Sequence, residues 1–590
     1  GLEAIESVFV THYNRLVRQG KQHDKIKRRI RAMETILDHK KRRSVDPREI
    51  EREELTIRLK RVEDLEPLEK KMAESETLDP LLVDAYRRIL AANKTGVAKK
   101  ADARLKKSAT KDILAESQAG SLALYCRLGR PDAEGLAISS LKAALKERRT
   151  NDKELPKLVK RLEGLEQRLQ EESVRGQGVV PGALADDYRL MQAKVTQIRR
   201  RMAGLVVLVE GAAEAGSAYV ATLSGEPAAE AAGKILKAAG TGEREFRYLC
   251  MAMLRGCTDT GLLSAVLKFV DKAKDPGLQA AGVDVLASAG SPELLVLARD
   301  RFLLSSSWEV RIAAVRALRK VRDMSSLPVL VDAMDRETGR VKAEVRDALR
   351  DLTGMSWGYD SDTWRKWLGE TGGELVAAKE KGEEEDEGTG LHFYGIRSES
   401  DRVLFVLDVS GSMLWDLHKD DVEPQEGDLS RIKMLKQECQ RAVASLKDGA
   451  KFNILVYAWE VKQWQSKPQD MNDKVRAEAR EWIEGLQAVG ATNLFGALKE
   501  GFKMAGVGAS SKYYEPAVDT IFFMSDVGEE GSRSGPSAGE IQNTDDILTF
   551  VREWNRLGKI TVHAIGVGDG HDAAFMQALA EENGGRYVAR

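Results

Sequence analysis

The sequence has little of what would place it in a simple structural class. Its 4 cysteines among 590 residues include no CxxC pair, so neither a disulfide framework nor a zinc site is predicted. Lys and Arg (92 residues) almost balance Asp and Glu (93 residues), which gives no overall attraction to nucleic acid or to acidic membranes. No apolar run approaches the ~20 residues that a membrane-spanning helix needs.

Aromatic residues (6%) and proline (14 residues) are also scarce, whereas alanine, leucine, lysine, arginine and glutamate dominate much of the first half. This composition favours helix. A chain of 590 residues is too long for one hydrophobic core, so several domains are expected. The chain begins with Gly1 and not with methionine, which leaves both an exported and a cytoplasmic location open.

Residues 1–205 are predicted to form helical hairpins with coiled-coil character, and this region is also a candidate for self-association. Two segments place apolar residues at alternating steps of three and four, the spacing of a heptad seam. A helix-breaking stretch at 175–182 separates them and indicates an antiparallel hairpin. The two seams comprise Leu155, Leu158, Leu162, Leu165 and Leu169, and Met191, Val195, Ile198, Met202 and Leu205.

Three basic clusters, at 25–31, 39–43 and 99–107, raise the question of an anionic partner. No aromatic residues are interleaved with them for base stacking. Glutamates lie nearby in the sequence, as they do on the solvated faces of amphipathic helices. We interpret the clusters as solvated helix faces and predict no nucleic-acid partner.

Residues 206–370 are predicted to form a helical solenoid. Four similar helical segments end at Leu254, Leu286, Leu318 and Leu349, a spacing of 31–32 residues, and further apolar helices lie between them. Units of this kind bury their apolar faces only by stacking on one another. The pattern resembles short HEAT-like repeats, with an irregular helical domain as the alternative. The glycine-flanked acidic stretch at 371–395 is predicted to be a flexible linker.

Residues 396–590 alternate predicted strands and helices, which is typical of an α/β fold with a doubly wound, mostly parallel sheet. The fold class is therefore multidomain, with an all-α N-terminal two-thirds and a C-terminal α/β domain. In such sheets, ligands bind at the carboxyl ends of the strands. Strands are expected at 403–408, 452–458, 461–465, 520–526, 560–567 and 586–589, and helices at 429–446, 475–486, 494–504, 541–557 and 573–582.

Three segments bring oxygen-bearing side chains to that edge of the sheet. The first strand ends at Asp408, and Ser410 and Ser412 follow at alternate positions. Thr492 precedes a predicted helix, and Asp526 ends another strand. Two carboxylates and three hydroxyls, without histidine or cysteine, suit Mg²⁺, Mn²⁺ or Ca²⁺ and disfavour zinc. Because few of these ligands are charged, a bound cation keeps positive charge and an open position for an acidic group of another molecule.

Asp-x-Ser-x-Ser after an apolar strand, a later Gly-x-Thr turn and a strand-terminal Asp resemble the metal-ion-dependent adhesion site of von Willebrand factor A (VWA) domains. The resemblance implies that Ser410 and Ser412 bind the metal directly and that Thr492 binds it directly or through water. Asp408 and Asp526 would act mostly through water or hydrogen bonds. In that family, the site captures an acidic side chain without catalysis. The resemblance therefore implies a Mg²⁺-dependent adhesion module whose partner is a protein with an exposed Asp or Glu.

The order of helical repeats, then residues 393–395 (Phe-Tyr-Gly), then this domain is similar to bacterial proteins that join HEAT-like repeats to a VWA domain. Three features depart from the family's pattern. Val527 follows Asp526 where a glycine is usual. The chain ends at Arg590 in the last predicted strand, so the switching by a C-terminal helix that some members use is not expected. Acidic residues at 416–423 and 529–530 are interpreted as solvated loops, with masking of the metal position as the alternative.

Other functions stay open on the sequence alone. A hydrolase needs an activated nucleophile, or a metal-bound water with a base, but Ser410 is not in a Gly-x-Ser-x-Gly elbow. We expect His563 in the core, and His571 at a helix start, where it is capping or exposed. A structural scaffold is the second alternative, with the helical repeats binding the partner and the VWA-like domain secondary. The third is a VWA-like fold that has lost its metal.

If an acidic loop masks the site, the combined change Glu529→Gln and Glu530→Gln removes two competing carboxylates. We then expect tighter binding of the acidic partner, because the open metal position becomes free. Unchanged affinity in a direct binding measurement would contradict masking by these two residues.

Overall fold

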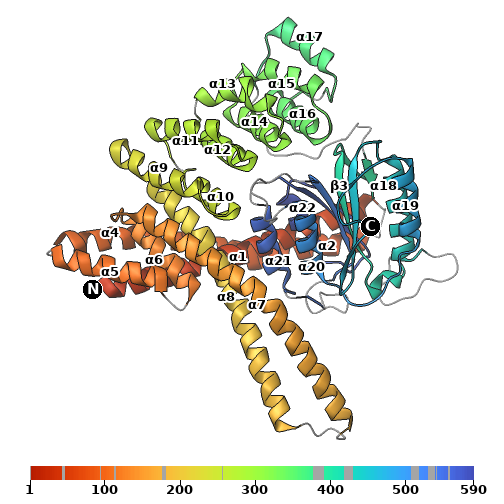
Figure 1. Cartoon of the computed structure of the whole chain (residues 1–590), viewed down its shortest axis with the longest axis horizontal. Coiled ribbons are helices and arrows are strands. Elements are labelled where there is room, and N and C mark those ends of the chain that lie inside the picture. The colour runs from red at the N-terminus through yellow and green to blue at the C-terminus, as the bar shows by residue number, and fades with distance from the viewer. Residues whose placement is uncertain are drawn as a thin grey trace. The chain divides into compact units, whose positions relative to one another are not determined.

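The computed structural model places the chain in two compact units (Figure 1). Unit 1 comprises residues 1–24 and 64–266, and unit 2 comprises residues 25–63 and 267–590. The residues that the structure describes are 2–42, 47–76, 78–92, 95–111, 114–175, 181–255, 257–290, 292–355, 357–375, 391–417, 429–506, 517–528, 538–539, 541–555 and 559–590.

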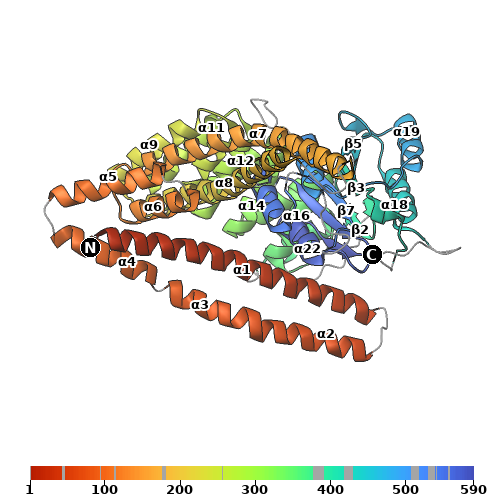
Figure 2. The same cartoon turned by 90° about the horizontal axis from the view of Figure 1, so that it is seen from below.

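Helices build unit 1. The first of them, α1 (Leu2–Arg42), is uninterrupted and belongs in part to each unit (Figure 2). Its first turns are held by Arg104, whose guanidinium donates to Glu3 (2.8 Å) and to Glu6 (2.5 Å). The other helices of unit 1 are α3 (Glu66–Glu76), α4 (Leu78–Ala92), α5 (Thr95–Lys111), α6 (Ala115–Arg127), α7 (Ala133–Arg175), α8 (Gly182–Val220), α9 (Gly225–Ala239) and α10 (Arg244–Ala252).

The predicted heptad hairpin is confirmed as the antiparallel pair α7 and α8 (Figure 1). Seam residues on both helices are buried because the two apolar stripes face each other. The connecting residues 176–180 lie outside the described part of the chain. The buried seam residues include Leu155, Leu158, Leu165, Val195 and Met202.

Helix α8 is long and apolar enough to span a membrane, although the sequence suggested no such segment. It meets this condition by its length and composition alone. Within the structure, 61% of the apolar 18-residue stretch of α8 is buried, and α8 packs against α6 and α7. These contacts are those of a core helix in a helical bundle.

The predicted solenoid is present as a series of helix pairs, and its four repeat leucines are at most 2% exposed. Helices α12 (Pro276–Ser288), α14 (Trp308–Val321) and α16 (Gly339–Thr353) stack in sequence in unit 2. The elements next to them in the sequence are α11 (Thr260–Lys272), α13 (Pro292–Asp300), the 3₁₀ turn Phe302–Leu304, α15 (Ser326–Arg336) and α17 (Ser361–Thr371). Stacking buries apolar faces that one helix pair alone would leave in water.

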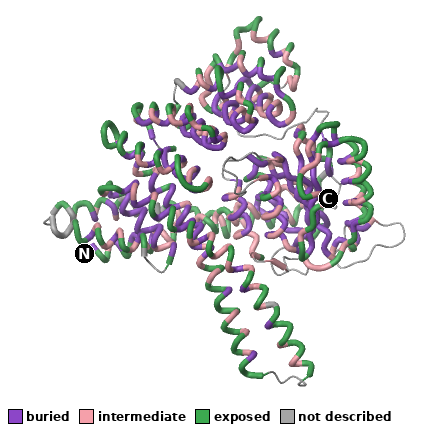
Figure 3. Tube along the Cα trace, in the orientation of Figure 1, coloured by how far each residue is buried: buried purple, intermediate pink, exposed green. Residues whose placement is uncertain are grey.

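The C-terminal part of unit 2 is the predicted α/β fold, with a sheet in the order β5-β4-β3-β7-β8-β9. Strands β4, β3, β7, β8 and β9 are parallel, whereas β5 and the short β6 pair antiparallel with β4. The sheet is largely buried (Figure 3). The strands are β3 (Arg402–Asp408), β4 (Lys451–Tyr457), β5 (Val461–Gln463), β6 (Gln469–Asp470), β7 (Thr520–Ser525), β8 (Thr561–Gly566) and β9 (Tyr587–Ala589).

Helices cover both faces of this sheet, because the strand side chains alternate between two apolar layers. Phe405 and Leu407 of β3 lie in one core with α18 (Arg431–Ser445) and α19 (Asp473–Glu484). Leu404 and Val406 meet Gly501 of α20 (Leu494–Met504), where a larger side chain would crowd Val406. The remaining helices are α21 (Thr544–Trp554) and α22 (Ala573–Glu581).

A small hairpin, β1 (Leu391–Phe393) and β2 (Ile396–Ser398), was not expected from the sequence. Its turn places Tyr394 (φ 50°) and Gly395 (φ 82°) in left-handed backbone. Phe393 is fully buried and packs edge-on against Phe405 at 5.1 Å between ring centroids. Residues 376–390 of the predicted acidic linker lie outside the described residues.

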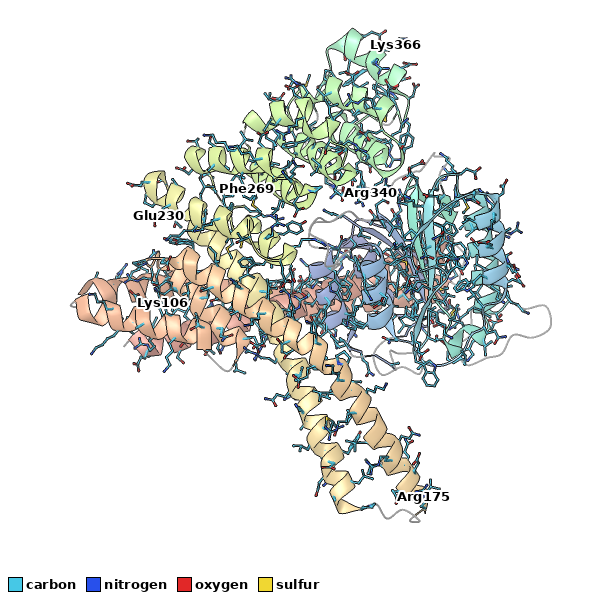
Figure 4. All side chains as sticks on the ribbon, viewed as in Figure 1. Lys106, Arg175, Glu230, Phe269, Arg340 and Lys366 are labelled. Carbon is cyan, nitrogen blue, oxygen red and sulfur yellow. The ribbon has the colours of Figure 1, made fainter. Side chains whose placement is uncertain are left out.

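Two repeat helices contact the amino-terminal edge of the sheet within unit 2. Arg340, on the first turn of α16 (Figure 4), donates to the backbone oxygens of Asp519 (3.0 Å) and Lys559. Its guanidinium also lies over the Trp308 ring, 5.7 Å from the centroid. Asp519 directly precedes β7 and Lys559 closely precedes β8, so this contact is at the opposite end of the strands from the predicted metal site.

The interpretation of residues 25–31 as a solvated helix face is wrong for Arg28, whereas Lys25 keeps 42% of its side chain exposed. Lys25 and Arg28, in the part of α1 that belongs to unit 2, form ion pairs with Asp545 of α21 at 2.7 Å and 2.8 Å. Only 14% of the Arg28 side chain is exposed. Both residues are therefore paired within the chain, through the same carboxylate of α21.

His563 gives the α/β fold a specific dependence on pH. It lies in β8, stacks on Phe522 at 4.9 Å and accepts a hydrogen bond from the Arg586 amide. Burial, and next the charges of Arg586 and Arg340, lower its pKa from 6.5 to about 3. The His563 side chain therefore takes up a proton near pH 6.5 in the unfolded chain, but only near pH 3 in the folded chain. As a result, stability that is present above pH 6.5 is lost as the pH falls toward 3.

The change His563→Asn keeps an acceptor near the Arg586 amide but removes this titration. We expect urea-unfolding stability to fall more steeply with decreasing pH in the wild type than in the variant. The extra slope approaches about 1.4 kcal/mol per pH unit between these two pKa values. Parallel pH profiles would contradict a neutral, buried His563.

Candidate metal site

The site begins where β3 leaves the sheet. Asp408 is the last residue of the strand and is fully buried. The Ser410 amide donates to its Oδ1 at 2.9 Å, and the Ser525 hydroxyl, from the end of neighbouring β7, donates to its Oδ2 at 2.7 Å. Both carboxylate oxygens are thus fixed by neighbours, so Asp408 organises the loop that follows it.

The loop after Asp408 turns the two serine hydroxyls toward each other. A short 3₁₀ helix, Gly411–Leu414, folds the chain back directly after Ser410. The Oγ atoms of Ser410 and Ser412 are 3.2 Å apart, and the Ser412 hydroxyl donates to Asp526 Oδ1 at 2.9 Å. Asp408, Ser410, Ser412 and Asp526 are therefore joined by short polar contacts, from two strand ends that are far apart in sequence.

Thr492 comes from a third loop that is tied to the first by backbone hydrogen bonds. The Gly411 amide donates to the Gly490 oxygen, and the Val489 amide donates to the Val409 oxygen, both at 2.8 Å. A Cβ atom on Gly411 would lie 3.2 Å from the Gly490 oxygen, so a side chain at residue 411 would crowd the close approach of the two loops. Thr492 itself is 5% exposed. All three predicted segments reach the same edge of the sheet.

Arg431, at the start of α18, is a site residue that sequence reasoning missed. Its guanidinium donates to Asp526 Oδ2 at 2.7 Å, and both side chains are fully buried. The same guanidinium lies over the Trp415 ring and donates to the Asp416 backbone oxygen at 3.3 Å. A Cβ atom on Gly568 (φ 79°) would lie 2.5 Å from it, so a side chain there would crowd the guanidinium. The sequence offers only a basic residue at the start of a helix, which does not indicate its partner.

The site buries more negative than positive charge. Burial, and next the charge of Asp526, raise the pKa of Asp408, while hydrogen bonds from Ser410 and Ser525 oppose the rise. The nearby Tyr457 hydroxyl donates to the Met524 oxygen at 3.1 Å, and burial followed by the charge of Asp408 raises its pKa. A cation placed among these groups would relieve their mutual repulsion.

The residues present fit a hard divalent cation. Two carboxylates and adjacent serine hydroxyls form an all-oxygen set, which suits Mg²⁺, Mn²⁺ or Ca²⁺. Asp526 Oδ2 is already held by Arg431, and Asp408 already accepts two hydrogen bonds. Among the described residues, no three His, Cys, Asp or Glu side chains cluster as metal ligands, so a carboxylate-rich or zinc-type centre is not indicated there.

Val527, which stands where a glycine is usual, fits the loop after Asp526 without left-handed backbone. Its side chain is fully buried, its amide donates to Ser525 Oγ at 3.1 Å, and its oxygen accepts from the Asp572 amide. Two acidic loops could mask the site. Asp416, in the first of them, belongs to the described residues and is 7% exposed. Residues 418–428 and 529–537 lie outside the described part of the chain.

The two histidines weighed for hydrolysis are engaged in structural contacts. His563 is in the core, as expected. The prediction that His571 is capping or exposed is wrong, because it is 8% exposed and contacts the Gly568 oxygen and the Tyr587 hydroxyl. The cap of α22 is instead Asp572, whose side chain accepts from the Phe575 amide at 2.9 Å.

Comparison with known proteins agrees with this architecture. Residues 401–589 match the model of the von Willebrand factor type A domain, and residues 233–350 match the model of HEAT repeats. The inter-alpha-trypsin inhibitor heavy chain H1 of Bos taurus is 24% identical over 198 residues, 33% of this chain and 19% of the relative. Heavy chain H4 of Homo sapiens is 24% identical over 204 residues, 34% of this chain and 20% of the relative. The chain thus spans about a fifth of the length of these curated relatives.

Solved structures similar to the chain include the von Willebrand factor type A protein from Catenulispora acidiphila, with a TM-score of 0.24 and 18% identity over 33% of this chain and 39% of that one. The PilB minor pilin from Streptococcus sanguinis has a TM-score of 0.24 and 19% identity over 32% of this chain and 56% of that one. The two matched domain types are typical of proteins that bind other proteins, and neither is typically catalytic. Residues 401–589 are therefore a von Willebrand factor type A domain, and HEAT repeats precede it in the chain.

Proposed function

We propose that the VWA domain is a non-catalytic, divalent-cation-dependent module that binds an acidic group of a protein partner. One observation carries the proposal, the continuous polar linkage Asp408–Ser410–Ser412–Asp526 at the carboxyl edge of the sheet. The HEAT repeats and helical hairpins form its scaffold. Mg²⁺ is the cation that we propose first, with Mn²⁺ and Ca²⁺ as the other oxygen-seeking candidates.

In this proposal, Ser410 and Ser412 hold the cation with their hydroxyls, and Thr492 supports it from the neighbouring loop. Asp408 orients the serine loop through the Ser410 amide, and Asp526 accepts from Ser412. When bound, the cation supplies a positive centre with an open position for a carboxylate of the partner. The two carboxylates of the site are occupied by hydrogen bonds, so a further acidic ligand has to come from another loop of the chain or from the partner.

Loss of Asp408 tests the cation site directly. We expect Mg²⁺ to raise the melting temperature of the wild type, because a ligand that binds only the folded state stabilises it, by about 2.7 kcal/mol at 100 times its Kd. In Asp408→Ala this stabilisation should vanish. Thermal melts with Mg²⁺ and with EDTA provide the measurement.

The matched control is Asp448→Ala, since the Asp448 side chain is 73% exposed and lies outside the site. This variant should keep the full Mg²⁺ response. If the wild type itself shows no change in melting temperature with Mg²⁺, Mn²⁺ or Ca²⁺, the cation-dependent function is wrong.

Arg431 should tune the same site through its charge. The change Arg431→Met removes a buried positive charge beside Asp526 while keeping much of the side chain's volume. We expect tighter Mg²⁺ binding in a calorimetric titration, because the site becomes more negative by one charge. We also expect a lower melting temperature in EDTA, since breaking a buried ion pair typically costs ~3–5 kcal/mol.

Arg441→Met, on the same helix, is the control for this change. The Arg441 side chain is 72% exposed and pairs with Glu438 on the helix surface. The Arg441→Met variant should have a Mg²⁺ affinity and a melting temperature in EDTA close to those of the wild type. An Arg431→Met variant with unaltered Mg²⁺ affinity would show that Arg431 has no electrostatic influence on the cation.

A further inference from the structure

Exposed apolar side chains gather at the edge of the VWA domain that carries the candidate cation site. Among the described residues from 391 to 590, the large apolar side chains that are exposed are Leu414 (52%), Trp459 (63%) and Val489 (61%). Each lies on a different loop. Leu414 ends the 3₁₀ turn that contains Ser412, Trp459 follows β4, and Val489 precedes the Gly490–Thr492 turn.

These three loops are joined to the site and to one another. The Val489 amide donates to the Val409 oxygen at 2.8 Å, one residue after Asp408. The Asn493 side-chain amide, next to Thr492, donates to the Trp459 backbone oxygen at 3.2 Å. A Cβ atom on Gly490 would lie 2.8 Å from Trp459 Nε1, so the indole ring lies directly against the turn that carries Thr492. The exposed apolar residues are therefore built on the same backbone as the predicted metal ligands.

Exposed apolar residues that are scattered singly are ordinary, but a group of them around a polar site is typical of a binding surface. Tryptophan is particularly enriched among residues that contribute most to binding energy in protein interfaces. An apolar surface makes no favourable contact with a free ion or a small hydrophilic carboxylate. It would gain from contact with apolar side chains of a protein partner.

We propose that Leu414, Trp459 and Val489 form an apolar rim around the cation, and that the partner is a protein segment whose Asp or Glu is flanked by apolar residues. This inference rests on the proposed cation-dependent function. Charge complementarity fixes the position of the acid at the cation, and burial of the flanking residues against the rim supplies the selectivity. A strongly acidic segment without apolar residues does not fit this surface.

A displayed library of random peptides tests this inference on the full chain. The chain is immobilised and exposed to the library with Mg²⁺, and bound peptides are eluted with EDTA and sequenced. We expect the eluted peptides to share one Asp or Glu with apolar or aromatic residues on either side. A selected peptide is then synthesised for affinity measurements.

The rim variant combines Leu414→Ser, Trp459→Ala and Val489→Ser. It should bind the selected peptide at least tenfold more weakly, with the same Mg²⁺-dependent rise in melting temperature as the wild type. The control variant combines Val296→Ser and Leu304→Ser, two comparably exposed residues of the repeat region (52% and 59% exposed). It should bind the peptide as the wild type does.

The outcomes separate this inference from the proposed function. Acidic peptides that are eluted by EDTA but show no apolar preference would overturn the rim and leave the cation-dependent function standing. Equal binding of the selected peptide to the rim variant and the wild type would do the same. A wild type that releases no peptide on addition of EDTA would contradict the proposed function, and the rim inference would fail with it.

Discussion

Two carboxylates, Asp408 and Asp526, lie at adjacent strand ends where almost no water reaches them, and the surrounding groups have to satisfy this buried charge. Each buried charge needs hydrogen bonds or an opposite charge to remain ionised. Asp408 takes two hydrogen bonds, from the Ser410 amide and the Ser525 hydroxyl, and Asp526 takes the Ser412 hydroxyl and the Arg431 guanidinium. The donors that satisfy this charge are the same groups that shape the predicted cation site.

The same constraint explains two glycines. Gly411 lets the serine loop meet the Gly490 oxygen, and Gly568 leaves space for the guanidinium of Arg431. A side chain at either position would push away a loop or the counter-charge, and the carboxylates would then lose partners. The absence of side chains at these two positions and the electrostatic balance of the site are therefore linked in this domain.

Much of the fold and site could be predicted because it depends on short-range patterns. Heptad spacing indicated the α7–α8 hairpin, leucine spacing indicated the stacked repeats, and apolar strands ending in acids indicated Asp408 and Asp526. Those two acids lie close together because β3 and β7 are parallel neighbours, a consequence of the alternating strand and helix pattern. Thr492 was predicted from the turn before a helix, and its role as a ligand stays a prediction.

The features that the sequence did not indicate depend on tertiary contacts. Arg431 and Asp526 are separated by 95 positions, and only the packing of α18 against the site brings them together. The ion pair between Arg28 and Asp545 joins the first helix to α21 across an even greater separation. The β1–β2 hairpin has strands of three residues, too short for a period-two pattern to be visible.

The charges of this site also explain why an apolar rim is useful. Arg431 already neutralises part of the negative charge, so a divalent cation bound here as proposed would face two carboxylates and one guanidinium and would retain net positive charge toward solvent. Such a centre attracts any carboxylate, and electrostatic attraction by itself distinguishes partners poorly in salt. Trp459 and its two neighbours add contacts that are short-ranged and insensitive to salt. A partner with only a charged group would bind the proposed cation but leave the apolar rim in water. A partner with only apolar groups would cover the rim but supply no ligand to the cation. On the proposed function, a requirement for both would let a site this small discriminate among acidic side chains.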